Sequence, residues 1–292
     1  MKKIRSNKAW LFVTPALVLL GFVAVLPLIM VVNYSFHDIF TLDTRVWVGL
    51  EWFEYHLRSS RFWESFGRSI CFSAIVLSIE IPLGIAIALF MPRKESLLTA
   101  LCIVSISIPL IVPWNMIAII WKIFLAPDFF GGILSIFGFE AMWTMNALQT
   151  WLVIIAMDVW HWTSLVVLLC YSSLSTIPSE FYQAGAIDGA SRWAVFRYIE
   201  LPKLKGVLTI AILLRFVDSF MIYAEPFYLN AGGPRSSTTF LAMDLGQEFV
   251  SFEYGPAAAR SVIYLIIIIS VTWVFKMTAN SRESKENHHR GR

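Results

Sequence analysis

Apolar residues in this chain come in runs long enough to cross a lipid bilayer, and no other feature constrains the fold as strongly. A membrane-spanning helix needs about 20 mostly apolar residues to cover roughly 30 Å of hydrocarbon. The composition agrees, because 58% of the residues are hydrophobic and 15% are charged, against about a quarter charged in soluble domains. Only helices and closed barrels satisfy the backbone in lipid, so helix-length runs predict an all-α, polytopic transmembrane bundle.

The runs predict one transmembrane domain over residues 1–292 with six spans and a polar tail at 280–292. The spans are expected at about 11–34, 69–91, 98–125, 151–174, 206–230 and 257–278. The first run is longer than the apolar core of a secretory signal, and no small-x-small cleavage site follows it, so we expect a retained helix. The second, third and sixth spans read as plain apolar runs, whereas the fourth and fifth carry charges.

Lysine and arginine are shared unevenly between the two sides of these spans. Fifteen lie in the two terminal tails and the 92–97 and 175–205 loops, and five lie in the other loops. Cytoplasmic loops carry the excess of positive charge, so both termini are expected in the cytoplasm. The loop at 35–68, with four arginines, fits this orientation least well.

Two segments outside the spans, and the cysteines, have patterns of their own. Residues 47–67 have apolar and aromatic side chains at helical spacing, which predicts a helix in the membrane interface, and 126–150 predicts a short re-entrant or interfacial element. Cys71, Cys102 and Cys170 lie in apolar runs without paired spacing, so we expect small buried hydrophobes.

The loop between the fourth and fifth spans, residues 175–205, is the most informative part of the sequence. Its Pro-Ser-Glu at 178–180 predicts a helix start, with an acid in the first turn. Gly189 predicts a break, and Pro202 is expected to end a second short helix before the fifth span. A helix–break–helix with small residues suits docking into a partner's groove, and it suits equally an amphipathic hairpin on the membrane surface.

The same loop resembles the signature of permeases of binding-protein-dependent ABC importers: Glu-Ala-Ala, three residues, Gly, nine residues, and Ile-x-Leu-Pro. Gln183 and Gly185 depart from it in type, whereas the spacing to Gly189 and Ile199 matches. Residues 187–190 have the form common in the carbohydrate branch. The resemblance implies a type I ABC importer permease fold and a loop that couples to an ATPase. It assigns coupling to Gln183, Ala184, Gly185, Asp188, Gly189, Ala190, Ile199, Leu201 and Pro202.

Other segments extend the resemblance over nearly the whole chain. Residues 48–63 are similar to the outer loop of the maltose and glycerol-3-phosphate permease type, and Gly-Gly-Pro at 232–234 indicates the first of two unlike permeases. Residues 160–171, 188–203 and 215–227 closely resemble the first permease of bacterial ABC glycerol importers.

The resemblance also implies partners and a location. These are a second permease forming a heterodimer, two ATPase subunits that carry ATP and Mg, and an extracytoplasmic solute-binding protein. The complex would lie in the inner membrane among its lipids. No cofactor on this chain is implied, and the sequence has neither a P-loop nor a catalytic or metal-binding motif. It also has no dense basic patch for nucleic acid.

Ionisable residues inside a span are costly and usually face a cavity or a partner. Asp158 and His161 stand three residues apart, as do Arg215 and Asp218, so each pair either lines a solute pathway or neutralises itself locally. A polyol needs hydrogen-bonding groups beside an apolar or aromatic face. The candidates for the solute pathway are Trp114, Asn115, Asp158, His161, Arg215, Asp218, Tyr223 and Glu225.

Glycerol or a similar small polyol is the solute that the resemblance to glycerol importers implies. A phosphorylated solute would need Arg or Lys presented to it, and Arg215 has an acid three residues away. A larger sugar, or glycerol-3-phosphate, is the alternative within the family. A proton-coupled secondary transporter would not need the 183–202 signature, and no inverted repeat is visible. An aquaglyceroporin-type channel would carry Asn-Pro-Ala motifs, which the sequence lacks.

Overall fold

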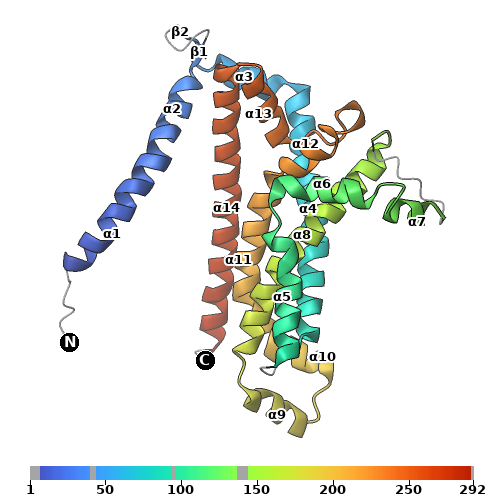
Figure 1. The fold of residues 1–292 in the computed structure, drawn as a ribbon. Coiled ribbons are helices and arrows are strands. Elements are labelled where there is room, and N and C mark those ends of the chain that lie inside the picture. The colour runs from blue at the N-terminus through green and yellow to red at the C-terminus, as the bar shows by residue number, and fades with distance from the viewer. Residues whose placement is uncertain (1–6, 40–43, 94–95, 137–143, 291–292) are drawn as a thin grey trace. The chain divides into compact units, whose positions relative to one another are not determined.

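The structure, a computed structural model, describes residues 7–39, 44–93, 96–136 and 144–290 (Figure 1). The chain forms two compact units: the first holds residues 1–63 and 245–271, and the second holds 64–244 and 272–292. Helices dominate both units, and the described residues include one small sheet. Three of the helices contribute residues to both units: α4 (Ser60–Phe90), α13 (Leu241–Val250) and α14 (Tyr254–Arg290).

The first unit begins with an apolar stretch that is long enough to span a membrane. It consists of α1 (Asn7–Leu20), a π turn labelled η1 (Gly21–Val25) and α2 (Leu26–Tyr34). Residues 10–34 have a mean hydropathy of 2.7, the highest of the candidate spans. The structure therefore has one continuous helical segment where the sequence predicted the first span.

A small hairpin and a short helix follow in the same unit. Strand β1 (His37–Ile39) pairs antiparallel with β2 (Arg45–Trp47), and α3 (Glu51–Arg58) comes next. The interfacial helix predicted over 47–67 is therefore wrong in its extent. Ser59 adopts an extended ψ of 122° and separates α3 from α4. Gly255, at the start of α14, is required because a Cβ there would lie 2.3 Å from the His37 carbonyl oxygen.

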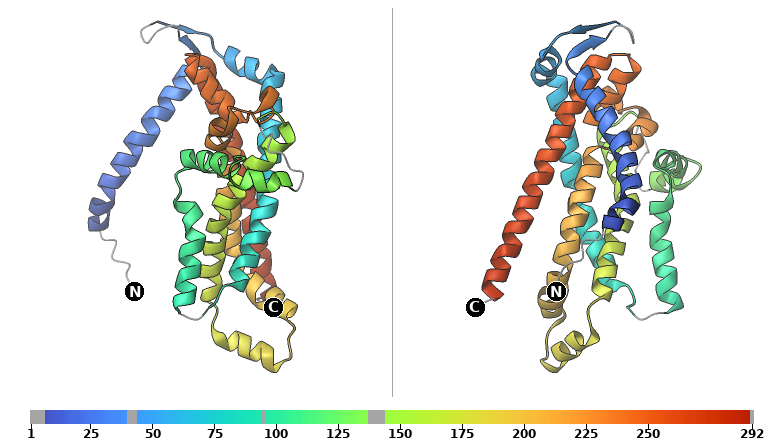
Figure 2. Two further views of the ribbon diagram at one scale, coloured as in Figure 1. Left: turned by 45° about the vertical axis from the view of Figure 1, so that its right-hand side comes forward. Right: turned by 90° about the vertical axis from the view of Figure 1, so that its left-hand side faces the viewer.

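The second unit contains the helical bundle that carries the candidate site. Its remaining elements are α5 (Leu97–Ile111), α6 (Trp114–Phe124), α7 (Phe130–Ile136), α8 (Ala147–Ser175), α9 (Ser179–Ile187), α10 (Arg192–Val195), the π turn η2 (Phe196–Glu200), α11 (Leu201–Phe220), α12 (Ala224–Asn230), the 3₁₀ turn η3 (Pro234–Ser236) and the start of α13, as far as residue 244. Helix α8 packs against α5, α6, α11 and α12. Figure 2 shows α5, α8 and α11 running side by side.

Two apolar clusters fill this bundle along α8. The first surrounds Ile154 and Met157 with side chains that include Phe72 and Ile117, and the second surrounds Val166 and Cys170. Helix α8 supplies buried residues along most of its length because both of its long faces meet other helices. A helix that is apolar all round is expected in such a position.

The third span, predicted over 98–125, consists of two helices separated by a sharp bend. Helices α5 and α6 meet at a bend of 100°. Val112 is extended, with φ −66° and ψ 126°, because the residue before a proline is disfavoured in the α conformation. Pro113 then caps α6. Five described helical segments are long and apolar enough to cross a membrane, and the bent pair makes a sixth if it counts as one span.

Pro202 does not end a helix, contrary to the sequence prediction. The π turn η2 precedes Leu201, and Pro202 lies in the first turn of α11. Backbone N–H groups in a first turn have no acceptor within their helix, so a proline there removes no helical hydrogen bond. The same arrangement occurs in the first unit, where η1 precedes Pro27 in the first turn of α2. A π turn shifts the hydrogen-bond register, so each proline begins a new helical segment inside a continuous one.

Several other expectations change in detail. The second span is not plainly apolar, because it contains the buried Glu80. The tail predicted from residue 280 is helical as far as Arg290. The short element expected over 126–150 is α7, although residues 137–143 of that prediction lie outside the described residues. Cys170 is buried as expected, whereas Cys71 is exposed.

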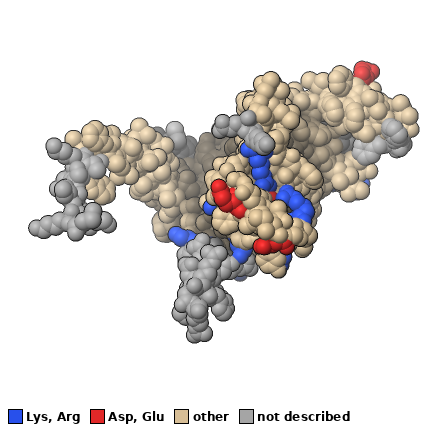
Figure 3. All heavy atoms as spheres, turned by 90° about the horizontal axis from the view of Figure 1, so that it is seen from below, with Lys and Arg blue, Asp and Glu red and all other residues tan. Residues whose placement is uncertain are grey.

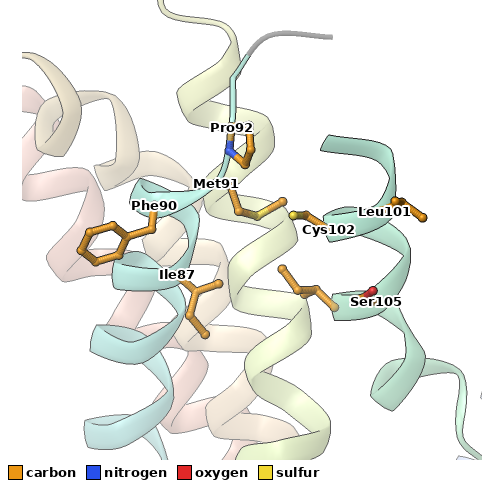
Figure 4. Close-up of a pocket in the computed structure, with 8 residues that line it drawn as sticks. Ile87, Phe90, Met91, Pro92, Leu101, Cys102 and Ser105 are labelled. Carbon is orange, nitrogen blue, oxygen red and sulfur yellow. The ribbon is translucent and has the colours of Figure 1, made fainter. Parts of the chain in front are cut away.

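An apolar hollow of about 440 Å³ lies between the end of α4 and the start of α5 (Figure 4). It is lined by Ile87, Phe90, Met91, Pro92, Leu101, Cys102, Ser105 and Ile106. A polyol site needs several hydrogen-bonding groups. This hollow offers one hydroxyl, and none of the residues predicted for the solute pathway lines it.

Candidate functional site

The loop between α8 and α11 forms two short helices joined by a tight turn. Helix α9 begins directly after Pro178 and ends at Ile187. Two residues later, Gly189 takes a φ of +67°. The turn is closed by a 2.8 Å hydrogen bond from the Ala190 amide to the Gly185 carbonyl oxygen. Left-handed backbone at Gly189 is easy for glycine and strained for most other residues. The break that the sequence predicted therefore has a conformational cause.

Gly185 of α9 lies close to the turn and to the helical segment that begins with α10. Helix α10 is capped by Ser191, whose Oγ accepts a hydrogen bond from the Ala194 amide at 3.2 Å. A Cβ added at Gly185 would lie 3.7 Å from Ile199 Cδ1 and 3.8 Å from Ala190 Cβ, which is ordinary van der Waals contact. An alanine, the residue type of the importer signature, would therefore fit at position 185 without strain.

The outer face of this loop is open among the described residues. Gln183, Ala184, Asp188, Gly189 and Ala190 are exposed, and so is Pro202, whereas Gly185, Ile199 and Leu201 are half-buried. The α9 side chain of Ile187 is 86% exposed, an unusual position for a large aliphatic residue. Figure 3 shows that basic and acidic side chains both reach the surface at this end. The loop thus offers a mixed surface of apolar, small and charged residues.

A set of polar residues behind the loop, which we call the loop cluster, was missed at the sequence level. It consists of Arg93, Tyr182, Arg192 and Glu200. The fully buried Glu200 Oε1 accepts hydrogen bonds from Arg93 Nη2 at 2.6 Å and from Arg192 Nη1 at 3.0 Å. The Tyr182 hydroxyl donates to the same oxygen at 3.5 Å. An acid within the Ile-x-Leu-Pro part of the signature was the available signal.

Tyr182 also lies beneath a guanidinium. The Arg93 Cζ stands 4.7 Å from the centroid of the Tyr182 ring. Burial raises the pKa of the Tyr182 hydroxyl above its usual value, against the opposing effect of Arg93. The hydroxyl therefore remains a neutral donor at physiological pH.

A second polar set, the interior cluster, lies inside the bundle. It joins Glu80 of α4, Asp158 of α8, and Arg215 and Asp218 of α11. Arg215 donates from Nε and Nη2 to the two Glu80 oxygens at 2.8 and 3.0 Å. It also donates to Asp158 Oδ2 at 2.6 Å and to Asp218 Oδ2 at 2.5 Å. Arg215, Glu80 and Asp158 are almost completely buried, so one guanidinium serves three carboxyl groups from three helices.

The interior cluster corrects one of the pairings considered for the sequence. Arg215 does pair with Asp218 on its own helix, but Asp158 pairs with Arg215 and not with His161. His161 instead stands edge-on to Trp162, with ring centroids 4.9 Å apart. The Trp162 ring covers the Arg215 guanidinium, whose Cζ lies 4.5 Å from the ring centroid. Spacing along one helix could not show the approach of α11 to α8.

The other predicted solute residues lie around this cluster without converging on one point. Trp114 is exposed at the start of α6, and its ring centroid is 6.3 Å from that of Trp162. Asn115 is exposed beside it. Tyr223, at the break between α11 and α12, stacks on Phe227 at 5.2 Å. Glu225 is buried in α12, a helix that packs against α6 and α8.

Comparison with known protein families identifies the chain. Residues 80–282 match the family described as "Binding-protein-dependent transport system inner membrane component". The chain belongs to this family. It is thus a permease of the ABC importer type, a membrane transport component and not an enzyme. The matched region contains both the loop cluster and the interior cluster.

Relatives of this permease carry names from sugar transport. It is 28% identical, over 94% of each chain, to the "Trehalose/maltose transport system permease protein MalF" of Thermococcus litoralis. It is 27% identical to the "Sulfoquinovosyl glycerol transport system permease protein SmoG" of Agrobacterium fabrum, over 91% of this chain and 88% of the relative.

A solved structure gives the fold. A chain of a bacterial ABC transporter "involved in the import of the acidic polysaccharide alginate" matches with a TM-score of 0.80 and 16% identity, over 95% of this permease and 96% of that chain. The type I importer permease fold expected from the sequence is therefore confirmed. Among the described residues, no three His, Cys, Asp or Glu side chains are placed to hold a metal ion.

Proposed function

We propose that this permease carries a sugar or small polyol, with glycerol favoured, across the inner membrane, driven by ATP hydrolysis on separate subunits. The observation that carries the proposal is the exposed helix–turn–helix of α9 and α10, which bears the importer signature over residues 183–202. Its outer face presents Phe181 and Ile187, which are 57% and 86% exposed. Large exposed apolar groups among small residues suit a groove on a partner protein.

The partners proposed for this chain follow from the family. They are a second permease, two ATPase subunits that bind ATP and Mg, and an extracytoplasmic solute-binding protein. One of the solved relatives is a "bacterial alginate ABC transporter in complex with alginate pentasaccharide-bound periplasmic protein". We place both termini and the 175–205 loop in the cytoplasm, because fifteen of the loop and tail Lys and Arg residues would then lie on that side.

The electrostatics of the interior cluster favour a neutral solute. Arg215 already donates to Glu80, Asp158 and Asp218, so its guanidinium is committed. Three carboxyl groups around one base would repel an anion brought close to them. Names of the related proteins include both trehalose/maltose and an acidic polysaccharide. Of these two kinds of solute, the charges of this chain suit the uncharged one.

Aromatic rings near the cluster supply the apolar face that a polyol or sugar needs. Trp114 and Trp162 lie with centroids 6.3 Å apart, and Tyr223 is partly exposed at the end of α11. Asn115 adds a neutral amide beside Trp114. We propose these residues as contacts for the solute and assign the charged residues of the interior cluster to structure.

Uptake of labelled glycerol by cells that express the complete importer tests this proposal. Excess unlabelled glycerol should compete strongly, a disaccharide weakly and glycerol-3-phosphate least. Competition by the disaccharide alone would mean that the solute is a larger sugar. In membrane vesicles, uptake should require ATP and persist without a proton gradient. Uptake driven by a proton gradient in the absence of ATP would refute ATP-driven import.

A further inference from the structure

Glu200 lies at the point where three segments of the permease meet. Its carboxylate has no exposed surface, although it sits beside a loop at the end of the bundle. Arg93 lies directly after α4, Tyr182 lies in α9, and Arg192 is the first residue of α10. Glu200 itself ends the π turn that leads into α11. One carboxylate oxygen thus links the residues directly after α4, both short loop helices and the start of α11.

Neighbouring hydrogen bonds strengthen the same junction. The Tyr171 hydroxyl of α8 donates to the Pro92 carbonyl oxygen at 3.0 Å. The Ser173 hydroxyl donates to the Lys203 carbonyl oxygen at 3.2 Å, which ties the end of α8 to α11. Hydrogen bonds between charged groups are the shorter and stronger kind, and those to Glu200 are the charged ones here. Removing the acid would leave two guanidinium groups facing each other.

The π turn gives Glu200 its position. The backbone hydrogen bond of a π turn spans one residue more than that of an α-helix, and such turns recur at functional sites. Here η2 accommodates Pro202 and directs the Glu200 side chain toward Arg93, which lies directly after α4. A plain α-helical turn would change the direction in which residue 200 points.

We propose that Glu200 is a positioning residue that makes α9, α10 and the end of α4, through Arg93, move as one body. Movement imposed on the loop would then reach α4 and α11 together. This inference rests on the proposed docking of an ATPase at the loop. Through α4 and α11 the movement would also reach the interior cluster, since Glu80 and Arg215 lie on those helices.

The first test measures position without using ATP. Spin labels are placed on the exposed residues Leu98 of α5 and Ala186 of α9, after the native cysteines have been replaced by alanine. In Glu200→Gln the distance distribution between the labels should broaden, whereas the original width should persist in the matched control Arg197→Gln. Arg197 is an exposed arginine of the same loop that makes no ion pair among the described residues. An unchanged distribution in Glu200→Gln would overturn the proposal.

The second test measures coupling in the complete importer. Glu200→Gln should lower solute-stimulated ATP hydrolysis by about tenfold, the size expected for losing a buried charge-assisted hydrogen bond, and leave basal hydrolysis unchanged. Glu200→Asp, which keeps the charge, should restore part of the stimulation. Equal loss of basal and stimulated rates would indicate a merely structural role and overturn the proposal. If wild-type permease shows no stimulation, the proposed docking fails, while the spin-label distances still decide whether Glu200 holds the loop.

Discussion

The two polar clusters of the bundle have opposite compositions. In the interior cluster one arginine serves three acids, whereas in the loop cluster one acid serves two arginines. Their surroundings differ as well. The Arg215 and Glu80 side chains have no exposed surface, but the side chains of Arg93 and Arg192 are 28% and 61% exposed. Within the interior cluster Arg215, Glu80 and Asp158 are closed to water and only Asp218 is partly exposed, at 32%, whereas the loop cluster is open to water through its bases.

Because of this difference, losing one member should cost unequal amounts of folding free energy in the two clusters. If the interior cluster loses a member, the remaining charges stay buried, and that is among the most costly events in a protein. If the loop cluster loses Glu200, its two arginines can be hydrated because both reach the surface, so this loss costs less folding free energy and frees the segments that Glu200 holds together. The interior cluster thus holds the helices of the bundle together, and the loop cluster holds the loop to them.

Arg215→Ala should have the largest effect of the substitutions that probe the two clusters. Three acids would be left without their base, and we expect a loss of about 3–5 kcal/mol of folding free energy, enough to remove most of the protein from the membrane. The measurements are the amount of permease in membranes and its melting temperature in detergent. Glu80→Gln should lose less, because Arg215 keeps Asp158 and Asp218. Arg197→Ala should match the wild type, and an Arg215→Ala protein with normal abundance would contradict the role of the cluster.

Substitutions of Gly189 test whether a partner covers the outer face of the loop, in front of the loop cluster. Among the described residues, no atom apart from those of the two adjoining residues lies within 4 Å of a Cβ added there, so only the φ of +67° resists substitution. Valine should suffer backbone strain of about 1–3 kcal/mol, whereas asparagine tolerates this conformation. If a partner covers this face, both Gly189→Val and Gly189→Asn should lose solute-stimulated ATP hydrolysis while membrane insertion stays normal. Full stimulation in Gly189→Asn would show that strain alone matters and that the face is free.

Tyr182→Phe should give the smallest effect and sharpens the picture of the loop cluster. The hydroxyl lies 3.5 Å from Glu200 Oε1, so its loss should cost less than about 0.5 kcal/mol. Because burial raises the pKa of Tyr182, its contribution is present below the ordinary tyrosine pKa and is lost only as pH rises through the higher folded value. Coupled ATP hydrolysis attributable to this group should thus be flat from about pH 6 to 9. If the difference in coupled ATP hydrolysis between Tyr182→Phe and the wild type changed with pH inside that range, this assignment would be contradicted.

Most of the architecture could be predicted from the sequence because its causes are local. Long apolar runs specify spans, and Gly189 and Pro178 specify the ends of the loop helices. The errors arose where a distant residue decides. Pro202 lies inside a helix because the preceding π turn absorbs it, and Asp158 turns toward Arg215 because α11 packs on α8. Glu80 was overlooked because one acid hardly alters the hydropathy of an otherwise apolar run.

The order of the interior cluster along the chain has a consequence for how the protein enters the membrane. A polypeptide leaves the ribosome from its N-terminus, so the acids of α4 and α8 arrive before the base of α11. A lone carboxylic acid can enter lipid as a neutral group by taking up a proton, but a guanidinium keeps its charge. An arginine at the centre of an isolated helix costs about 2.5–3.5 kcal/mol to insert. Helix α11 therefore meets its counter-charges already in place, and co-translational insertion of this half of the protein becomes a cooperative step that depends on the earlier helices.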